Sequence, residues 1–193
     1  MGSMENADPS DRLVVADAAA WRAWLDANES RSDGIRLVLA KKGVTEPTSL
    51  TYAEALEEAL CSGWIDGRRN ALDGTTYLQH FTPRRKASLW SKRNVDFVAG
   101  LIADGRMRER GHMEIERAKA DGRWERAYSG QADAAVPDDL AAALAESPAA
   151  AAHFEGLTRA DRYLAIHQVI TASSAALRAK RIGRLVASWG SGA

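Results

Sequence analysis

Two side chains near the middle of the sequence have the chemistry for proton transfer. Asp66 lies in the segment Gly-Trp-Ile-Asp-Gly, and His80 lies in Leu-Gln-His-Phe. A carboxylate and an imidazole are common general acids and bases, and histidine changes charge near neutral pH. Asp66 and His80 are therefore the candidate catalytic residues. The alternatives are a carboxylate that pairs with a neighbouring arginine and a strand histidine that faces solvent.

Basic and aromatic residues surround these two groups. Residues 63–93 hold seven Lys or Arg and two Asp, whereas the whole chain balances 26 basic against 26 acidic side chains. Guanidinium groups bind phosphate or carboxylate in bidentate fashion, and tryptophan rings stack on bases or sugars. The candidate ligand-binding residues are Trp64, Asp66, Arg68, Arg84, Arg85, Trp90, Ser91, Lys92 and Arg93.

The same basic segment suggests what kind of ligand it binds. Ser91 is expected to begin a helix, whose first backbone N–H groups favour an anion. We predict a nucleotide, a phosphorylated metabolite or a nucleic acid at this surface. The alternative is a solvated loop whose arginines pair with acidic residues elsewhere in the chain. A pI near 6.9 argues against a protein that coats DNA.

The sequence predicts neither a metal site nor a cofactor. The histidines at 80, 112, 153 and 167 show no metal-ligand spacing, and Cys61 is the single cysteine. Cys61 is expected at the C-terminal end of a helix, where the dipole disfavours a thiolate, so we expect a core residue.

The C-terminal part of the sequence carries a second set of basic residues. Arg178, Lys180, Arg181 and Arg184 are spread over the polar face of an amphipathic helix. They form either a solvated face or a second anchor for a polyanion. His167 lies on the side of Tyr163 and Ile170, which favours a packed core histidine over a ligand.

These residues require a scaffold of short strands and capped helices. We expect strands at residues 12–16, 35–40, 64–69 and 75–81, with the last two forming a hairpin and Thr82-Pro83 ending the strand. Asp17, Thr51 and Ser91 are expected to cap helices, and glycines at 63, 105 and 122 to end them. Helices alone follow residue 137. The predicted fold class is α+β: a small, mostly antiparallel sheet with packed helices, followed by an all-helical C-terminal region.

We expect residues 1–9 to be a tag remnant and disordered N-terminus, residues 10–128 an α+β core domain, and residues 137–190 a helical region packed on that core. No apolar run is long enough to span a membrane, and no signal peptide is evident, so a cytoplasmic location is expected. Either a monomer or a homodimer is compatible with the sequence.

Several segments resemble the YdeI/OmpD-associated family, also called bacteriocin-protection proteins. They are residues 51–67, 81–85, 89–94, 101–107 and 118–124, and the helical tail around residues 162–187. The resemblance implies a small bacterial protein without an established reaction, linked by name to resistance against bacteriocins or antimicrobial peptides. It brings no catalytic residues, and family descriptions suggest a periplasmic setting.

Three functional interpretations follow. The first is a binding module that holds an anionic ligand at residues 63–93. The second is a small enzyme that uses Asp66 or His80 as general acid or base beside an arginine-lined anion site. The third is a resistance protein that acts through a protein partner.

Overall fold

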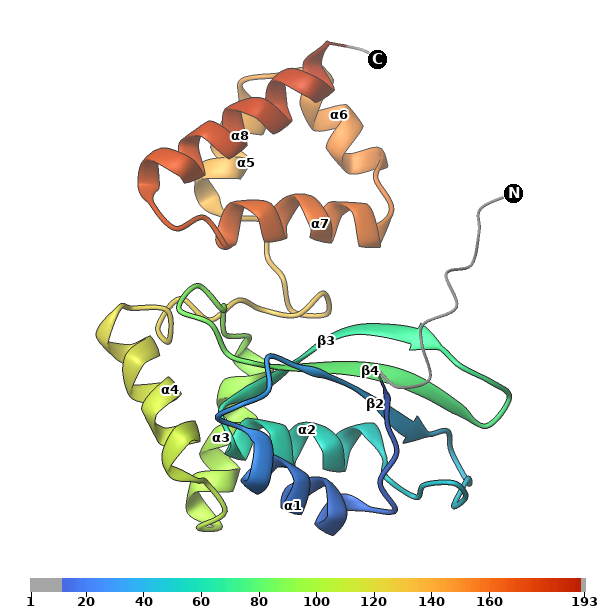
Figure 1. Cartoon of the computed structure of the whole chain (residues 1–193). Helices are drawn as coiled ribbons and strands as arrows, with labels where there is room; N and C mark the ends of the chain where they lie inside the picture. Colours follow the sequence, from blue (N-terminus) through green and yellow to red (C-terminus); the bar gives the residue numbers. More distant parts are fainter. Residues whose placement is uncertain (1–11, 192–193) are drawn as a thin grey trace. The chain divides into compact units, whose positions relative to one another are not determined.

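The computed structural model describes residues 12–191, which form two compact units (Figure 1). The first unit consists of residues up to Ser88 together with Asp96–Asp121. The second consists of Leu89–Val95 and the residues from Gly122 onward. The tag remnant expected at residues 1–9 lies outside the described residues.

A four-stranded sheet organises the first unit. Its strands are β1 (Arg12–Leu13), β2 (Ile35–Ala40), β3 (Trp64–Ala71) and β4 (Thr76–Pro83), in the order β1-β2-β4-β3. β1 runs parallel to β2, whereas β2–β4 and β3–β4 are antiparallel. The predicted small, mostly antiparallel sheet is therefore confirmed.

Two helices cover one face of this sheet (Figure 1). They are α1 (Ala18–Asn28) and α2 (Tyr52–Cys61). The amide of Ala20 donates to Asp17 Oδ1 at 2.9 Å, and Thr51 and Glu54 form the predicted capping box. Trp21 of α1 is fully buried and lies 5.7 Å from the Phe81 ring of β4. These aromatic contacts show which face of β4 belongs to the core.

Two further helices are α3 (Lys92–Ala103) and α4 (Glu109–Ala120). Gly105 and Gly122 have φ values of +66° and +73°, the left-handed conformation that ends a helix. Gly111 of α4 is buried, and a Cβ there would lie 2.3 Å from the carbonyl oxygen of Cys61. α4 can approach the end of α2 this closely because residue 111 has no side chain.

The second unit contains only helices after residue 137. They are α5 (Asp138–Ala145), α6 (Pro148–Gly156), α7 (Arg159–Ile170) and α8 (Ala175–Gly190). Their shared core is made of Leu140, Leu144, Ala150, Phe154, Ala165, Ile166, Val169 and Ile182. The α+β order, with a sheet first and helices after it, agrees with the sequence.

Four strand boundaries differ from the prediction, the smallest change being that β4 begins at Thr76 instead of residue 75. β1 ends at Leu13 instead of residue 16, and β3 continues to Ala71. β4 continues to Pro83, which pairs with Trp64, although Thr82-Pro83 was expected to end the strand. A proline is compatible with this position because the pairing of β4 with β2 ends at Phe81, so Pro83 has only β3 as a neighbour, as in an edge strand. No helix among residues 12–191 is long and apolar enough to cross a lipid bilayer.

Candidate functional site

A bulge in β3 determines which side chains surround His80. Asp66 pairs with Phe81 and Arg69 pairs with Gln79, so Gly67 and Arg68 together oppose the single residue His80. The side-chain amide of Gln79 donates to the carbonyl of Gly67 at 2.8 Å and so holds the bulge. The bulge places the exposed Arg68 beside His80 on one face of the sheet.

The imidazole of His80 lies between two glycines. A Cβ at Gly34 would lie 3.1 Å from Nε2, and a Cβ at Gly67 would lie 3.6 Å from Nδ1. Gly34 also has φ +149°, which side-chain-bearing residues rarely adopt. Gly34 and Gly67 therefore add no side chain of their own beside the ring.

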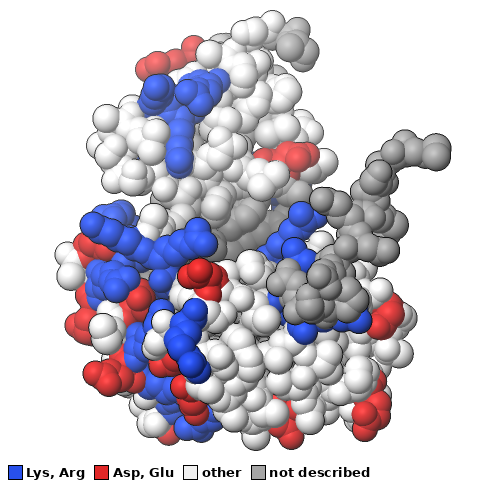
Figure 2. Space-filling model, viewed as in Figure 1, with Lys and Arg blue, Asp and Glu red and all other residues white. Residues whose placement is uncertain are grey.

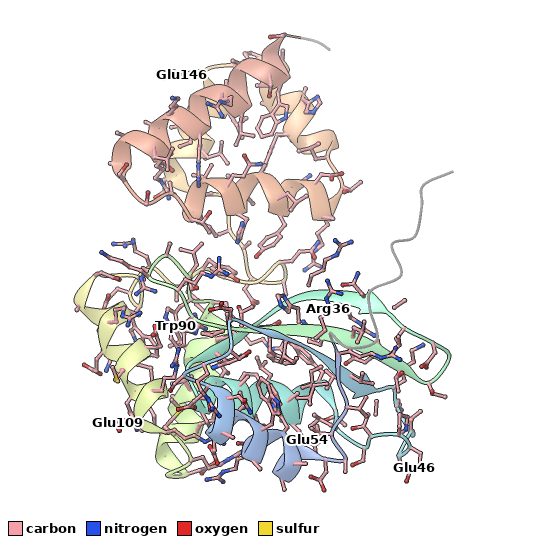
Figure 3. The ribbon with its side chains drawn as sticks, in the orientation of Figure 1. Arg36, Glu46, Glu54, Trp90, Glu109 and Glu146 are labelled. Carbon is pink, nitrogen blue, oxygen red and sulfur yellow. The ribbon has the colours of Figure 1, made fainter. Side chains whose placement is uncertain are left out.

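Two arginines lie in line with His80 on the neighbouring strands of the sheet. Arg36 of β2 pairs with His80, and Arg12 of β1 pairs with Arg36. Neighbouring strands are about 4.8 Å apart, so Arg12, Arg36, His80 and Arg68 form one row across all four strands. Arg36 lies on the side of the sheet away from α1 and α2 (Figure 3). We call these four residues the cationic row.

The cationic row concentrates basic side chains on one face of the sheet. Its three arginines are exposed, and His80 is half-buried. Lys and Arg side chains are visible over the sheet in Figure 2, whereas those around α4 are mixed with Asp and Glu. An anion on the row would bind to several donors at once.

The structure does not bring the two candidate catalytic residues together. Asp66 shares its sheet face with Phe81, whereas His80 shares the opposite face with Arg36. The hydroxyl of Tyr52 donates to Asp66 Oδ2 at 2.9 Å, which ties the start of α2 to β3. Asp66 is therefore a partner of α2, and any proton transfer by His80 would proceed without it.

Two residues predicted to contact a ligand belong to the core of the first unit. Trp64 is 0% exposed and packs edge-on against Trp21 and Trp24. Arg84 is 4% exposed, and its amide donates to the carbonyl of Gly63. Stacking by Trp64 and direct contact by Arg84 are corrected, because both side chains are buried. Arg85 is exposed, and its amide donates to Ser88 Oγ.

The remaining predicted contact residues belong to the second unit. Trp90 is 2% exposed and packs against Trp124, so its predicted stacking on a ligand is also corrected. Ser91 caps α3 as expected, since the amide of Asn94 donates to its Oγ at 3.2 Å. The amide of Lys92 donates to the carbonyl of Tyr128. Two of the amides expected to bind an anion at this helix start are thus already bonded.

A buried ion cluster connects three segments of the first unit, and the sequence analysis did not anticipate it. Glu58 of α2 accepts from Arg106 at 2.8 Å and from the guanidinium of Arg108. Arg108 also pairs with Asp26 of α1 at 3.0 Å and donates to Ser62 Oγ at 2.7 Å. The Glu58 side chain is only 9% exposed. The adjacent pair Glu57-Glu58 on a capped helix was the only sequence signal for this cluster.

The structure offers little for metal or thiol chemistry. Residues 12–191 contain no group of three His, Cys, Asp or Glu side chains that could hold a metal ion. Cys61 is buried as expected, and burial, with a smaller contribution from Glu58, raises the pKa of its thiol. The thiol is therefore protonated and acts as a core side chain.

The C-terminal basic residues have different surroundings. Arg178 donates to both carboxylate oxygens of Asp139, from Nε at 2.6 Å and from Nη2 at 2.8 Å. This pairing lowers the pKa of Asp139. Burial, and then the charge of Arg181, lowers the pKa of His167. Both groups therefore bind protons less readily in the folded protein than in the unfolded chain.

These two shifts predict how acid affects the helical unit. A pKa lowered by folding contributes stability above the unfolded pKa, and this stability is lost as pH falls. The unfolding free energy is expected to decrease first below about pH 6.5 through His167 and again below about pH 4 through Asp139. Hydrogen exchange of α7 and α8 amides across this range would measure both steps. His167→Gln should remove the upper step and Asp139→Asn the lower. His112→Gln is the control. If the decrease below about pH 6.5 persisted in His167→Gln but disappeared in His112→Gln, the assignment of this step to His167 would be contradicted.

Comparison with known families divides the chain into two segments. A family described as Domain of unknown function (DUF8412) matches residues 13–114, more than half of the 193 residues. A family described as Bacteriocin-protection, YdeI or OmpD-Associated matches residues 133–192. Neither the curated proteins nor the solved structures compared with the chain gave a match.

These matches restrict the predicted resemblance to the YdeI/OmpD-associated family to a shorter part of the chain than the sequence suggested. The YdeI/OmpD-associated match covers the helical tail, whereas the quoted segments from residue 51 to residue 107 lie within the other match. Arg36, Arg68 and His80 of the cationic row therefore lie in the segment matched by the Domain of unknown function (DUF8412) family, and Arg12 immediately precedes that segment. The chain belongs to the DUF8412 family, and its residues 133–192 are similar to the family described as Bacteriocin-protection, YdeI or OmpD-Associated.

Proposed function

We propose that the first unit binds an anionic ligand at the cationic row. The observation that carries this proposal is the register, which aligns Arg12, Arg36 and His80 on adjacent strands and places Arg68 in the bulge opposite His80. The ligand class is a phosphate-bearing molecule, such as a nucleotide, a phosphorylated metabolite or a nucleic acid, because guanidinium groups match phosphate oxygens in pairs.

The bare backbone beside His80 supports close approach by such a ligand. Gly34 and Gly67 flank the imidazole ring and present no side chain of their own to a phosphate that approaches it. Arg69 of β3 is oriented differently, with its guanidinium 3.8 Å from the centre of the Tyr77 ring. The bulge thus separates one arginine that packs on the sheet from one that is available to a ligand.

The first test is a binding experiment at low salt with pyrophosphate, ATP and a fluorescent single-stranded oligonucleotide. Arg36→Gln and Arg68→Gln are each expected to weaken binding about tenfold, since a hydrogen bond to a charged group contributes about 1.5–3 kcal/mol. For the oligonucleotide, each substitution should also reduce the salt dependence by about one charge.

The matched control is Lys42→Gln, which removes an exposed positive charge from the loop after β2. It should change affinity by less than about twofold, because an exposed charge away from the site acts only through screened solvent. No binding of any of the three probes at low salt would contradict the proposal, as would equal effects of Lys42→Gln and Arg36→Gln.

The family description favours a second candidate function. The C-terminal segment matches a family described by the words bacteriocin-protection, and we propose such a role as an alternative for the whole protein. Cells that lack the gene should then survive a bacteriocin challenge less well than cells that carry it. Unchanged survival would count against this role and would leave the anion-binding proposal unaffected.

A further inference from the structure

A pocket lies between two helices of the second unit. It is lined by His167, Gln168 and Thr171 of α7 and its end, and by Arg181, Arg184, Leu185 and Ser188 of α8. Its volume is about 520 Å³, within the range of roughly 300–1,000 Å³ that is typical of small-molecule sites. We call it the α7–α8 pocket.

The charged groups of the α7–α8 pocket are all basic. Its lining contains two arginines and no Asp or Glu, and α8 itself has no acidic residue. Basic side chains gather over α8 in Figure 2. Arg178, one turn before Arg181, is already neutralised by Asp139. The positive charge of the pocket therefore comes from arginines that no carboxylate of its lining balances.

The two arginines of the pocket keep most of their donors available. Arg181 donates one Nη1 hydrogen bond to the carbonyl of Gln168 at 2.6 Å, which positions its guanidinium without neutralising it. Arg184 is exposed and has no hydrogen bond or ion pair with any residue from 12 to 191. Residues three apart on a helix project from the same side, so the two guanidinium groups can reach one ligand.

The other lining residues indicate what the rest of the ligand is like. The hydroxyl of Thr171 donates to the carbonyl of His167 at 2.6 Å, and that of Ser188 donates to Leu185 at 2.8 Å. Because both hydroxyl protons are used within the helices, the guanidinium groups are the main donors for an anion. Leu185 and the imidazole of His167, which packs edge-on against Tyr128 at 4.8 Å, provide a less polar wall.

We propose that the α7–α8 pocket binds a small organic phosphate monoester, with the phosphate on Arg181 and Arg184 and the organic part against Leu185 and His167. Paired guanidinium groups fit the oxygens of a phosphate, which carries up to two negative charges near neutral pH. This site belongs to the YdeI/OmpD-associated segment and does not depend on the cationic row of the first unit.

The proposal is tested by titrating the full-length protein with phenyl phosphate while the imidazole resonances are followed by NMR. A saturable shift of His167 is expected, and its pKa should rise on binding because an anion offsets the nearby arginine charge. Inorganic phosphate should bind several-fold more weakly, since it lacks the apolar part, and benzoate more weakly still, since it carries one charge in place of two.

Three variants distinguish binding in the α7–α8 pocket from general attraction of an anion by the basic helix α8. Arg184→Gln should weaken phenyl phosphate binding about tenfold, and Arg181→Gln by a similar factor. Lys180→Gln is the matched control, because it removes an exposed charge from α8 outside the pocket. It should alter affinity by less than about twofold. Circular dichroism would verify that each variant is folded. If Arg181→Gln does not fold, Arg184→Gln decides the test.

Two results would overturn the proposal. One is the absence of a saturable His167 shift, and the other is an equal loss of affinity in Lys180→Gln and Arg184→Gln. Equal affinities for phenyl phosphate and inorganic phosphate would overturn the assignment to a monoester. Arg36→Gln should leave the His167 titration unchanged. A failure of the α7–α8 pocket proposal can therefore be distinguished from a failure of the cationic-row proposal.

Discussion

Replacing Glu58 with alanine is expected to destabilise the first unit by roughly 3 kcal/mol, because it removes the carboxylate that Arg106 and Arg108 share and leaves the largely buried Arg108 with the exposed Asp26 as its remaining carboxylate partner. Glu58 accepts from the guanidinium groups of both Arg106 and Arg108, and its side chain is 9% exposed. Arg108 also contacts Asp26 and Ser62, so the loss would spread to α1 and to the end of α2. A change of this size is a large share of the stability of a small domain.

Glu57 provides the matched control for this prediction. It is the neighbouring carboxylate on α2, but it is 31% exposed and, among residues 12–191, accepts from Arg106 alone. Glu57→Ala should therefore cost less than about 1 kcal/mol. Denaturant unfolding, with hydrogen exchange of the α2 and α4 amides to localise the effect, measures both variants. Similar costs for the two substitutions would show that the cluster does not hold these helices together.

Replacing Gly111 with alanine is expected to destabilise the first unit by about 1–3 kcal/mol, the usual cost of an overpacked contact. The added Cβ would lie 2.3 Å from the Cys61 carbonyl oxygen and 2.5 Å from Met107 Cε. The methionine end can move aside, but the carbonyl is backbone and accepts from the amide of Arg108 at 3.1 Å. α4 would have to shift away from α2.

The direction of this effect opposes the general rule for helices. Alanine is normally favoured over glycine inside a helix by about 0.5–1 kcal/mol. Gly100 of α3 lies in the same unit, and a Cβ added there would point into open space. Gly100→Ala should therefore stabilise the protein by that amount, and the same unfolding measurement compares the two. A stabilising Gly111→Ala would contradict the close helix contact.

Local sequence signals were sufficient to predict the elements of the fold. Asp17, Thr51 and Ser91 begin helices because their side-chain oxygens accept from backbone amides within the next turn. Gly105 ends a helix because it adopts positive φ. These effects depend on residues close together in sequence, so neither the sheet nor the core needs to be known.

The candidate site could be predicted only in part, because it depends on pairing between distant strands. His80 and Arg68 were identified from the basic segment, but Arg12 and Arg36 join them only because β2 lies between β1 and β4. Alternation alone placed Trp64 and Asp66 on one face of β3. Which face is the core depends on Trp21 of α1, and no local pattern reveals that Trp64 packs against it.

The most direct test of the cationic row is NMR mapping of pyrophosphate binding to the full-length protein at low salt. If the row binds the anion, saturable shifts should appear at the imidazole of His80 and at the amides of Gly34, Arg36 and Gly67, and Arg36→Gln should reduce them together. Saturable shifts confined to Lys92 and Arg93, or no saturable shift around His80, would contradict the central claim that this face of the sheet is an anion-binding site.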